Sequence, residues 1–349
     1  MLGANEIHVV GAALIAFAVT LGATPVARRV ALRTGFLDHP AGYKEHSHAT
    51  PYLGGVAVMA GVLAGTLIFD AAGDYKRLVA AAVLVCALGT LDDRIQLGVG
   101  LRLFAQFATA VALWSVDLGW TMLDSPTANL ALTIVWVVGI TNAFNLMDNQ
   151  DGATGTVAGV SGAGIGTLAL TQGAVPLAVI AFSVAGASLG FLRYNLARPA
   201  KIFLGDGGSM PLGLLIACTI MAIPDGRLDW TLLFATAPLA GLPILDTTLV
   251  VVSRLRRGDQ VLSGHRDHLT HRLLGMLGTE RKVAVVLAAA QAALCGLSIA
   301  LFQLDQAAVL AASAAYLVVG VAIITQLELM DARPTVEVAV PAGVEERAS

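Results

Sequence analysis

Aspartate and asparagine side chains gather directly after long apolar runs in this sequence. The clearest example is NAFNLMDNQDGATG at 142–155, which follows the apolar run LALTIVWVVGI and contains no lysine or arginine. Adjacent carboxylates are costly at a low-dielectric surface unless they are protonated or bridged by a cation. Together with the acids of LDDR and FLGDGGS, the set is Asp92, Asp93, Asn142, Asn145, Asp148, Asp151 and Asp206. We therefore expect a cation from outside the chain to bind there.

The type of ligand indicates which cation. Hard oxygen ligands suit Mg²⁺, which keeps several waters and typically takes one or two carboxylates plus substrate phosphates. DNQDG is not a calcium loop, because the spacing of its acids is wrong and no glutamate follows at the twelfth position. The cysteines Cys86, Cys218 and Cys295 lie inside apolar blocks without metal-ligand spacing, and we interpret them as packing residues. The prediction is a Mg²⁺ site for a phosphorylated substrate, with Mn²⁺ as the alternative metal.

Basic residues occur in other loops. The segment SRLRRGDQVLSGHRDHLTHRLLG, 253–275, places three histidines among arginines, which would supply positive charge to phosphate oxygens. Simpler interpretations compete: an aspartate at a helix start is most often an N-cap, and arginines at a membrane edge often only set topology. GDGGS provides backbone that lets a ligand approach closely. Asp246 lies within an apolar segment, so it must face the bundle interior as a packing partner or a site contributor.

The elements that position these residues are membrane helices. Hydrophobic residues make up 56% of the 349 residues and charged residues 13%, against about 25% charged in soluble domains. The apolar blocks are long enough to cross ~30 Å of hydrocarbon as helices. We expect an all-α, polytopic membrane helix bundle of about eleven spans. These lie near 8–29, 53–70, 77–91, 101–120, 129–147, 155–172, 174–193, 208–223, 229–252, 282–302 and 305–326.

Basic residues set the orientation. With the N-terminus outside, only Lys76, Arg77 and Arg227 of the 21 lysines and arginines lie outside, which leaves 18 inside, as positive cytoplasmic loops require. The C-terminus and all the polar motifs are then cytoplasmic. We expect a multi-pass protein of the cell membrane with a single integral-membrane domain, 1–330, and a disordered cytoplasmic tail, 331–349. The first block is interpreted as a retained span and not a signal peptide.

The motifs resemble those of the polyprenyl-phosphate N-acetylhexosamine-1-phosphate transferases. In matching order they are DHPAGYKEHSHATPYLGG, LDDR, NAFNLMDNQDG, FLGDGGS, PILDTTLVVVSRLRRG and HRDHLTHRLL, spread from about Gly35 to Leu274. The resemblance implies Mg²⁺-dependent transfer of a sugar-1-phosphate from a UDP-sugar to a polyprenyl phosphate in the membrane, with release of UMP. The lipid product would initiate the synthesis of a cell-envelope glycan.

The resemblance also implies individual roles. Asp206 resembles the principal Mg²⁺ ligand, and Asn145 a second ligand or a contact to the diphosphate. Asp92 resembles the base toward the lipid phosphate, and its neighbour Asp93 would position Lys44 or the metal. The acidic pair Asp148 and Asp151 lies between metal and uridine in this family, with Asp151 nearest the uracil. The expected catalytic residues are Asp92, Asp93, Asp148, Lys44 and His268, and the expected substrate contacts are Asn142, Asn145, Asn149, Asp151, His46, His265, Arg266, His271 and Arg272.

Some positions depart from the family pattern. Asn149 stands where members commonly have glycine, with Gln150 after it, so the backbone contacts of the uridine pocket are in question. His265 replaces a usual acid and Thr270 replaces one of a histidine pair, and these changes bear on the sugar more than on the chemistry. The triple histidine of the MurNAc-pentapeptide branch is missing. An N-acetylhexosamine donor, most simply UDP-GlcNAc, is therefore expected.

Other functions remain as alternatives. The donor could be another UDP-HexNAc or UDP-MurNAc-pentapeptide. A transporter is the rival from a different class, but transporters place charges near the midplane between internal repeats, and no repeat is visible here. No nucleic-acid partner is expected. A homodimer through the apolar surfaces is compatible with the resemblance, although no residue specifies it.

Overall fold

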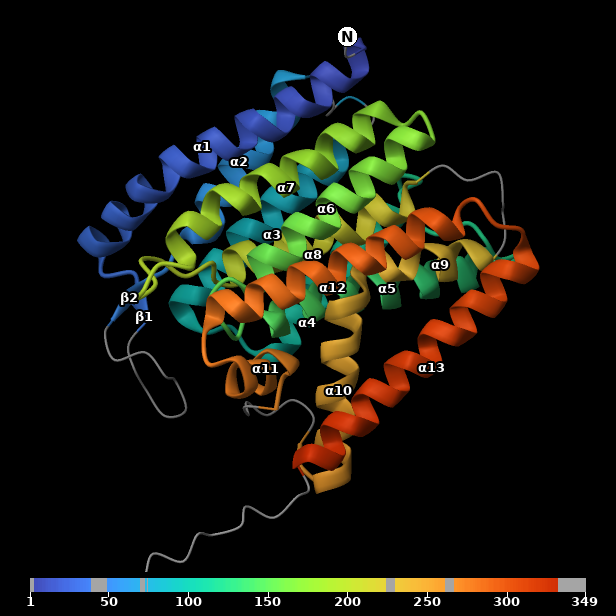
Figure 1. The fold of residues 1–349 in the computed structure, drawn as a ribbon. Helices are drawn as coiled ribbons and strands as arrows, with labels where there is room; N and C mark the ends of the chain where they lie inside the picture. The colour runs from blue at the N-terminus through green and yellow to red at the C-terminus, as the bar shows by residue number, and fades with distance from the viewer. Residues whose placement is uncertain are drawn as a thin grey trace, which may run out of the picture.

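The computed structural model describes residues 3–38, 49–69, 73, 75–223, 230–260 and 267–331. In these ranges the chain is almost entirely helical (Figure 1). The elements are α1 Ala4–Thr34, β1 Leu37–Asp38, β2 Thr50–Pro51, α2 Gly54–Ile68, α3 Lys76–Ile95, α4 Val99–Trp114, α5 Pro126–Met147, α6 Ala153–Thr171, α7 Val175–Asn195, α8 Asp206–Met221, α9 Thr231–Thr236, the 3₁₀ turn η1 Ala237–Ala240, α10 Gly241–Arg257, α11 Leu269–Leu277, α12 Glu280–Leu301 and α13 Gln306–Asp331.

The apolar segments expected from the sequence coincide with these helices. Seven helical segments in the described ranges are long and apolar enough to cross a membrane, and α2, α4 and α8 are shorter apolar helices. The ninth expected span is bent into α9, η1 and α10, with Pro238 in the 3₁₀ turn. The short helix α11 was not expected. The fold is thus an all-α bundle whose helices fit a membrane protein.

Helix α8 lies at the centre of the bundle (Figure 1). Every residue from Gly207 to Met221 is buried, because the helix is apolar on all sides and packs among α2, α3 and α5. Its start approaches α2 closely: a Cβ added to Gly55 would lie 2.2 Å from the backbone nitrogen of Gly208. The GDGGS glycines therefore serve helix contact here, a different use from the ligand approach expected from the sequence.

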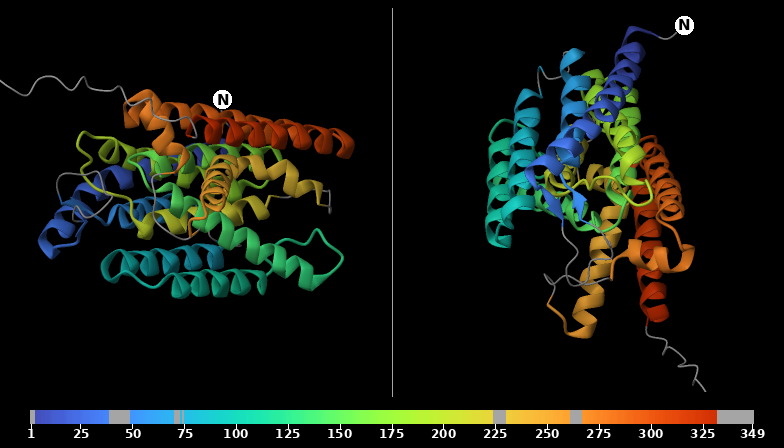
Figure 2. Two further views of the ribbon diagram at one scale, coloured as in Figure 1. Left: turned by 90° about the horizontal axis from the view of Figure 1, so that it is seen from below. Right: turned by 90° about the vertical axis from the view of Figure 1, so that its left-hand side faces the viewer.

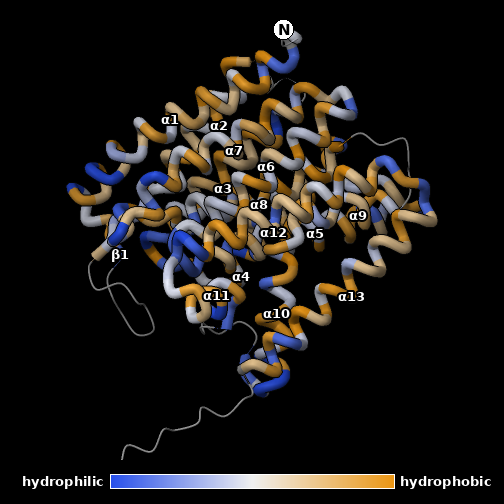
Figure 3. Tube along the Cα trace, in the orientation of Figure 1, coloured by the Kyte–Doolittle hydropathy of each residue, from blue (hydrophilic) through white to orange (hydrophobic). Residues whose placement is uncertain are grey.

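The remaining helices surround α8 in layers. The long helix α1 packs on α2 and α7, while α3 and α4 lie on one side of the bundle and α12 and α13 on the other (Figure 2). Helix α13 carries apolar side chains that are more than half exposed, including Val318 at 68% and Val321 at 64%. Apolar residues likewise cover much of the helices in Figure 3. Such a surface suits hydrocarbon and not water.

The strands β1 and β2, the α7–α8 loop and the start of α12 lie at one end of the bundle (Figures 1 and 3). The antiparallel pair β1–β2 pairs Leu37 with Pro51. The segment after β2 is hydrogen-bonded to the α7–α8 loop, with Gly54 N donating to Phe203 O at 3.1 Å. The α12 start joins the same loop through Arg281, which donates to Leu196 O at 3.1 Å. Motifs far apart in the sequence therefore share one end of the molecule.

Candidate active site

The expected metal ligand Asp206 is the first residue of α8, and Asn145 reaches it from the last turn of α5. Asn145 Nδ2 donates to Asp206 Oδ1 at 2.7 Å and to Ser209 Oγ at 3.0 Å. The two residues named from the resemblance as metal ligands are thus direct neighbours. Gly205, which precedes Asp206, has φ of 72°, and a Cβ there would also lie 2.5 Å from Asp93 Oδ2. Glycine is needed at this turn for both reasons.

Asp93, near the end of α3, caps the start of α8. Its Oδ1 accepts from the backbone nitrogen of Asp206 at 2.9 Å, and its Oδ2 accepts from that of Gly207 at 3.1 Å. A carboxylate at this position satisfies two helix N–H groups and complements the positive end of the helix dipole. Asp93 is therefore a residue that positions Asp206.

Asp92 and Asp206 share a cation that sequence reasoning missed. Arg102 Nη1, from α4, lies 3.0 Å from Asp92 Oδ2 and 3.2 Å from Asp206 Oδ2. Asp92 is 4% exposed, and its Oδ1 accepts from Leu97 N at 2.5 Å. The isolated arginine in the apolar segment GLRLFAQ was the available sequence signal. Arg102 offsets the repulsion between the two carboxylates.

Asp148 and Asp151 follow the end of α5. Burial raises the pKa of Asp148 well above its ordinary value, and the negative charges of Asp206 and Asp93 raise that pKa further. Asn195, at the end of α7, holds the adjoining turn, because its Oδ1 accepts from Gly152 N at 2.7 Å and its Nδ2 lies 3.4 Å from Asp151 Oδ1. A cavity of about 230 Å³ opens beside Asp151 and the α7–α8 loop.

The acid cluster, by which we mean Asp92, Asp93, Asp148 and Asp206, offers the hard oxygen donors that Mg²⁺ prefers. Within the described ranges no group of three or more His, Cys, Asp or Glu side chains is arranged as a metal site. A site of one carboxylate and one amide oxygen would therefore depend on substrate phosphates and water, as Mg²⁺ sites often do. The donor atoms are hard oxygens, and the mutually close acids favour a bound cation. Asp206 and Asn145 offer donor atoms of the right type, but Asp206 Oδ1 accepts from Asn145 Nδ2 and Asp206 Oδ2 pairs with Arg102, so binding of the ion would replace both contacts.

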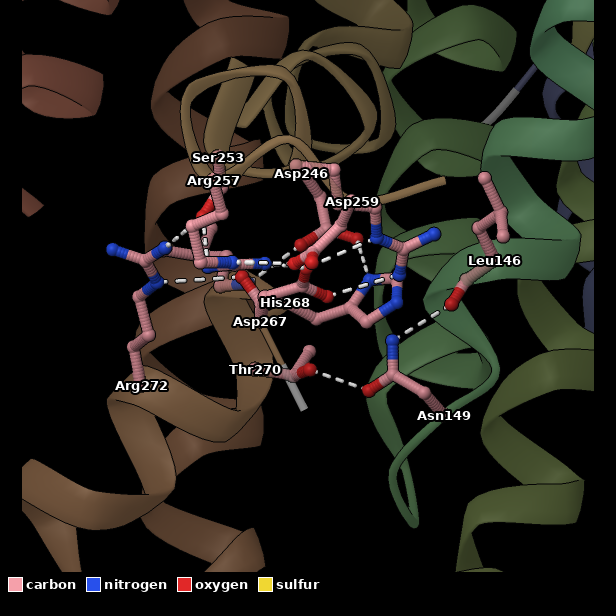
Figure 4. Close-up of polar contacts among 12 residues, drawn as sticks. Leu146, Asn149, Asp246, Ser253, Arg257, Asp259, Asp267, His268, Thr270 and Arg272 are labelled. Atoms are coloured by element: carbon pink, nitrogen blue, oxygen red, sulfur yellow. Dashed lines mark hydrogen bonds and ion pairs between the residues drawn. The ribbon is translucent and has the colours of Figure 1, made fainter. Parts of the chain in front are cut away.

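The described segment 267–275, which we call the last loop, is held by Asp246, whose role the sequence left open. Asp246 is fully buried in α10, its Oδ2 lies 2.9 Å from His268 Nδ1, and its Oδ1 accepts from Leu269 N at 2.6 Å (Figure 4). The carboxylate thus fixes both the ring of His268 and the start of α11. Asp246 is a residue that positions an expected catalytic histidine.

The arginines near the last loop mostly bind acids of the protein. Arg254 donates from Nε and Nη2 to the two oxygens of Asp267, each at 3.0 Å, and Arg257 Nη2 donates to the same carboxylate at 2.6 Å. Arg272 Nη2 donates to Glu328 Oε1 at 2.7 Å and to Ser253 Oγ at 3.2 Å. Glu328, on α13, was not expected to take part. These contacts join α11 to α10 and α13.

Two further expected substrate contacts, Asn142 and Asn149, are also hydrogen-bonded within the protein. Asn142 donates to Gln106 Oε1 on α4 and to Val138 O, the latter at 2.8 Å. Asn149 donates to Leu146 O at 2.7 Å and accepts a hydrogen bond from Thr270 Oγ1 (Figure 4). Lys44, His46, His265 and Arg266 lie outside the described residues. The rings of His268 and His271 are neighbours, with centroids 5.9 Å apart.

Comparison with known proteins places the chain in a family. Residues 76–223 match the family model for glycosyl transferase family 4. The chain is 32% identical over 302 residues to a probable undecaprenyl-phosphate N-acetylglucosaminyl 1-phosphate transferase from Bacillus subtilis, covering 82% of each protein. It is 33% identical over 325 residues to decaprenyl-phosphate N-acetylglucosaminephosphotransferase from Mycolicibacterium smegmatis, covering 81% of this chain and 79% of the relative. It is 29% identical over 289 residues to undecaprenyl-phosphate alpha-N-acetylglucosaminyl 1-phosphate transferase from Escherichia coli, covering 78% of each. With such relatives over four fifths of its length and the acid cluster formed at one end of an all-α bundle, the chain belongs to glycosyl transferase family 4.

Proposed function

We propose that the protein transfers GlcNAc-1-phosphate from UDP-GlcNAc to a polyprenyl phosphate and releases UMP. The observation that carries the proposal is the placement of Asp206 at the start of the central helix α8, with Asn145 hydrogen-bonded to it at 2.7 Å. The acid cluster surrounds this point, and the relatives named for such a transfer match four fifths of the chain. A polyprenyl diphosphate sugar of this kind would begin a cell-envelope glycan.

The proposed reaction is a direct displacement. An oxygen of the lipid phosphate forms a bond to the β-phosphorus of the UDP-sugar, while the bond from that phosphorus to the oxygen bridging the two phosphates breaks. That oxygen leaves with UMP. Phosphoryl transfer depends mostly on positioning and charge neutralisation, so little covalent chemistry is required of the protein. A two-step route through an aspartyl phosphate is the alternative, and a phosphosugar adduct formed with donor alone would support it.

Asp206 and Asn145 would hold Mg²⁺, or Mn²⁺ in its place, which when bound neutralises phosphate charge and stabilises the departing UMP. Asp93 keeps Asp206 at the start of α8. Arg102 keeps Asp92 next to Asp206. A phosphate monoester has a second pKa of about 6, so the attacking oxygen is largely deprotonated at neutral pH. We therefore assign Asp92 mainly to positioning and only secondarily to proton removal.

Asp148, Asp151 and the last loop would bind the donor. Asp151 lies at the cavity beside the α7–α8 loop, which suits its expected place near the uracil. His268, fixed by Asp246, and His271 would approach the sugar and the diphosphate. Lys44, His46, His265 and Arg266 would complete this set. Arg272, whose Nη2 donates to Glu328 and Ser253, would support the last loop.

The proposed topology has eleven spans in the cell membrane, with α9, η1 and α10 counted as one. Its N-terminus lies outside and its C-terminus in the cytoplasm, as the basic residues favour. The end that holds the acid cluster would then face the cytoplasm. In this arrangement, residues 1–330 form a single transferase domain and 331–349 a tail. A homodimer remains a prediction.

The test measures UMP release by the purified protein in nanodiscs. Undecaprenyl phosphate, Mg²⁺ and UDP-GlcNAc are supplied together and then each omitted in turn, and other UDP-sugars replace UDP-GlcNAc in parallel. Asp206→Asn removes the expected metal ligand. Asp305→Asn is the matched control, because Asp305 caps α13 in the turn after α12, far in the fold from the acid cluster, and asparagine retains the cap.

We expect release that requires lipid phosphate and metal, disappears in Asp206→Asn and persists in Asp305→Asn. UMP release with a different UDP-sugar would change the assignment of the donor and leave the proposed type of reaction unchanged. If well-folded protein released no UMP with any UDP-sugar, the proposed enzymatic function would be refuted and a transporter would be favoured.

A further inference from the structure

One side-chain hydrogen bond joins the end of α5 to α11. The hydroxyl of Thr270 donates to Asn149 Oδ1 across 121 residues of sequence, and Asn149 Nδ2 donates to Leu146 O at 2.7 Å (Figure 4). Thr270 is fully buried. Both polar atoms of the Asn149 amide thus bind groups of the protein, and we call the hydrogen-bonded link from α5 to α11 the bridge.

The bridge connects two functional segments. Asn149 directly follows Asp148, a member of the acid cluster, and Thr270 lies between His268 and His271. The hydrogen bond therefore joins a residue next to the acid cluster to a residue between the two histidines.

Other hydrogen bonds of the segment from His268 to Arg272 lead to the helices α10 and α13. Asp246 holds His268 and the start of α11 against α10, and Glu328 holds Arg272 toward α13. These contacts place the His268–His271 segment relative to α10 and α13. The Thr270–Asn149 bond instead ties it to the end of α5, next to the acids.

We propose that the Asn149–Thr270 pair sets the spacing between the acid cluster and the His268–His271 segment, and thereby the affinity for the UDP-sugar. The inference rests on the proposed function. A donor diphosphate must reach the acid cluster at one end and the last loop at the other, so its binding depends on this spacing. The lipid phosphate, which approaches Asp92, does not bridge the two segments. Asn149 and Thr270 are positioning residues in this account.

The test is a double-mutant cycle in nanodiscs with separate KM values for UDP-GlcNAc and undecaprenyl phosphate. Thr270→Val removes the hydroxyl at nearly constant volume, Thr270→Ser keeps it, and Asn149→Ala removes the acceptor. The matched control is Thr167→Val on α6, where the hydroxyl bonds only within its own helix, to Ala163 O. Thermal unfolding is measured for every variant, because a purely structural role would change stability alone.

We expect Thr270→Val to raise the KM for UDP-GlcNAc by about 3- to 10-fold, the usual effect of one lost hydrogen bond, while the KM for the lipid and kcat change little. Thr270→Ser should restore the KM, Thr167→Val should leave it unchanged, and the double variant should match Asn149→Ala alone. Additive effects of the two substitutions, or equal changes in both KM values, would overturn the proposal. Wild-type protein without any UMP release would instead refute the proposed function.

Discussion

The carboxylate of Asp246 lies 2.9 Å from Nδ1 of His268, and the acid is fully buried in α10. The same carboxylate accepts a hydrogen bond from Leu269 N. A charge inside an apolar segment is thereby compensated by groups from the last loop. Since Nδ1 binds Asp246, Nε2 is the ring atom of His268 that can contact a substrate, in the tautomer with its proton on Nδ1.

Asp246→Asn should lower kcat/KM by about 10- to 100-fold, because a hydrogen bond to a charged group is worth about 1.5–3 kcal/mol. Asparagine can still accept from Leu269 N, so the fold should persist. Kinetics with UDP-GlcNAc and thermal unfolding are compared between the variant and wild type. Unchanged kinetics in the folded variant would show that His268 needs no partner on Nδ1.

Arg102 should be essential for the activity that depends on the acid cluster. Arg102→Gln leaves Asp92 and Asp206 without their shared cation, and we expect a loss of about 10- to 100-fold in kcat/KM. Arg102→Lys should recover only part of this, since an ammonium lacks the planar fork of the guanidinium. The Mg²⁺ concentration for half-maximal activity is measured in parallel. Full activity in Arg102→Gln would make this arginine a topology anchor only.

Glu328 should stabilise the last loop from α13. Its carboxylate and the Arg272 side chain are 8% and 7% exposed, so Glu328→Ala would remove the carboxylate that pairs with a buried cation, at a cost of about 3 kcal/mol. The control is Glu280→Ala, whose pair with Arg198 is exposed at 37% and 49% and contributes under about 1 kcal/mol. Denaturant unfolding in detergent gives both values. Equal losses would contradict the assignment.

Asp267 should make the last loop sensitive to acid. Burial alone would raise the pKa of Asp267, but the hydrogen bonds and charge of Arg254 and Arg257 outweigh it and lower that pKa to about 2. Because the folded pKa lies below the ordinary 3.8, the stabilisation is complete above about pH 4 and is lost as the pH falls toward 2. Asp267→Asn should therefore cost about 2 kcal/mol at neutral pH.

Unfolding curves of wild type and Asp267→Asn, recorded from pH 7 downward, check this prediction. The difference between the two proteins should stay constant to about pH 4 and then shrink as wild type loses its own advantage. If the difference in stability between the two proteins grew on acidification, its sign would be wrong, and the ion pairs of Asp267 would not be its cause.

The helices followed from the sequence to a large extent. Each expected apolar segment coincides with helical structure, because the length of an apolar run is a local property. The bend at η1 was missed, since Pro238 stands in an otherwise continuous apolar stretch. The nine-residue helix α11 was also missed, because polar residues of the last motif interrupt its apolar pattern. The close packing of the GDGGS glycines on α2 could not be predicted, because it depends on how the helices pack in the bundle.

The candidate acids could be named from the sequence, because their types and their resemblance to family motifs are properties of short segments. Their partners could not. Arg102 reaches Asp206 across 104 residues and Thr270 reaches Asn149 across 121. Asp246 meets His268 only because the start of α11 lies against α10. The sequence by itself determined which residues are expected to carry the chemistry, whereas tertiary structure decided which side chains contact them, since packing between distant helices leaves no local pattern.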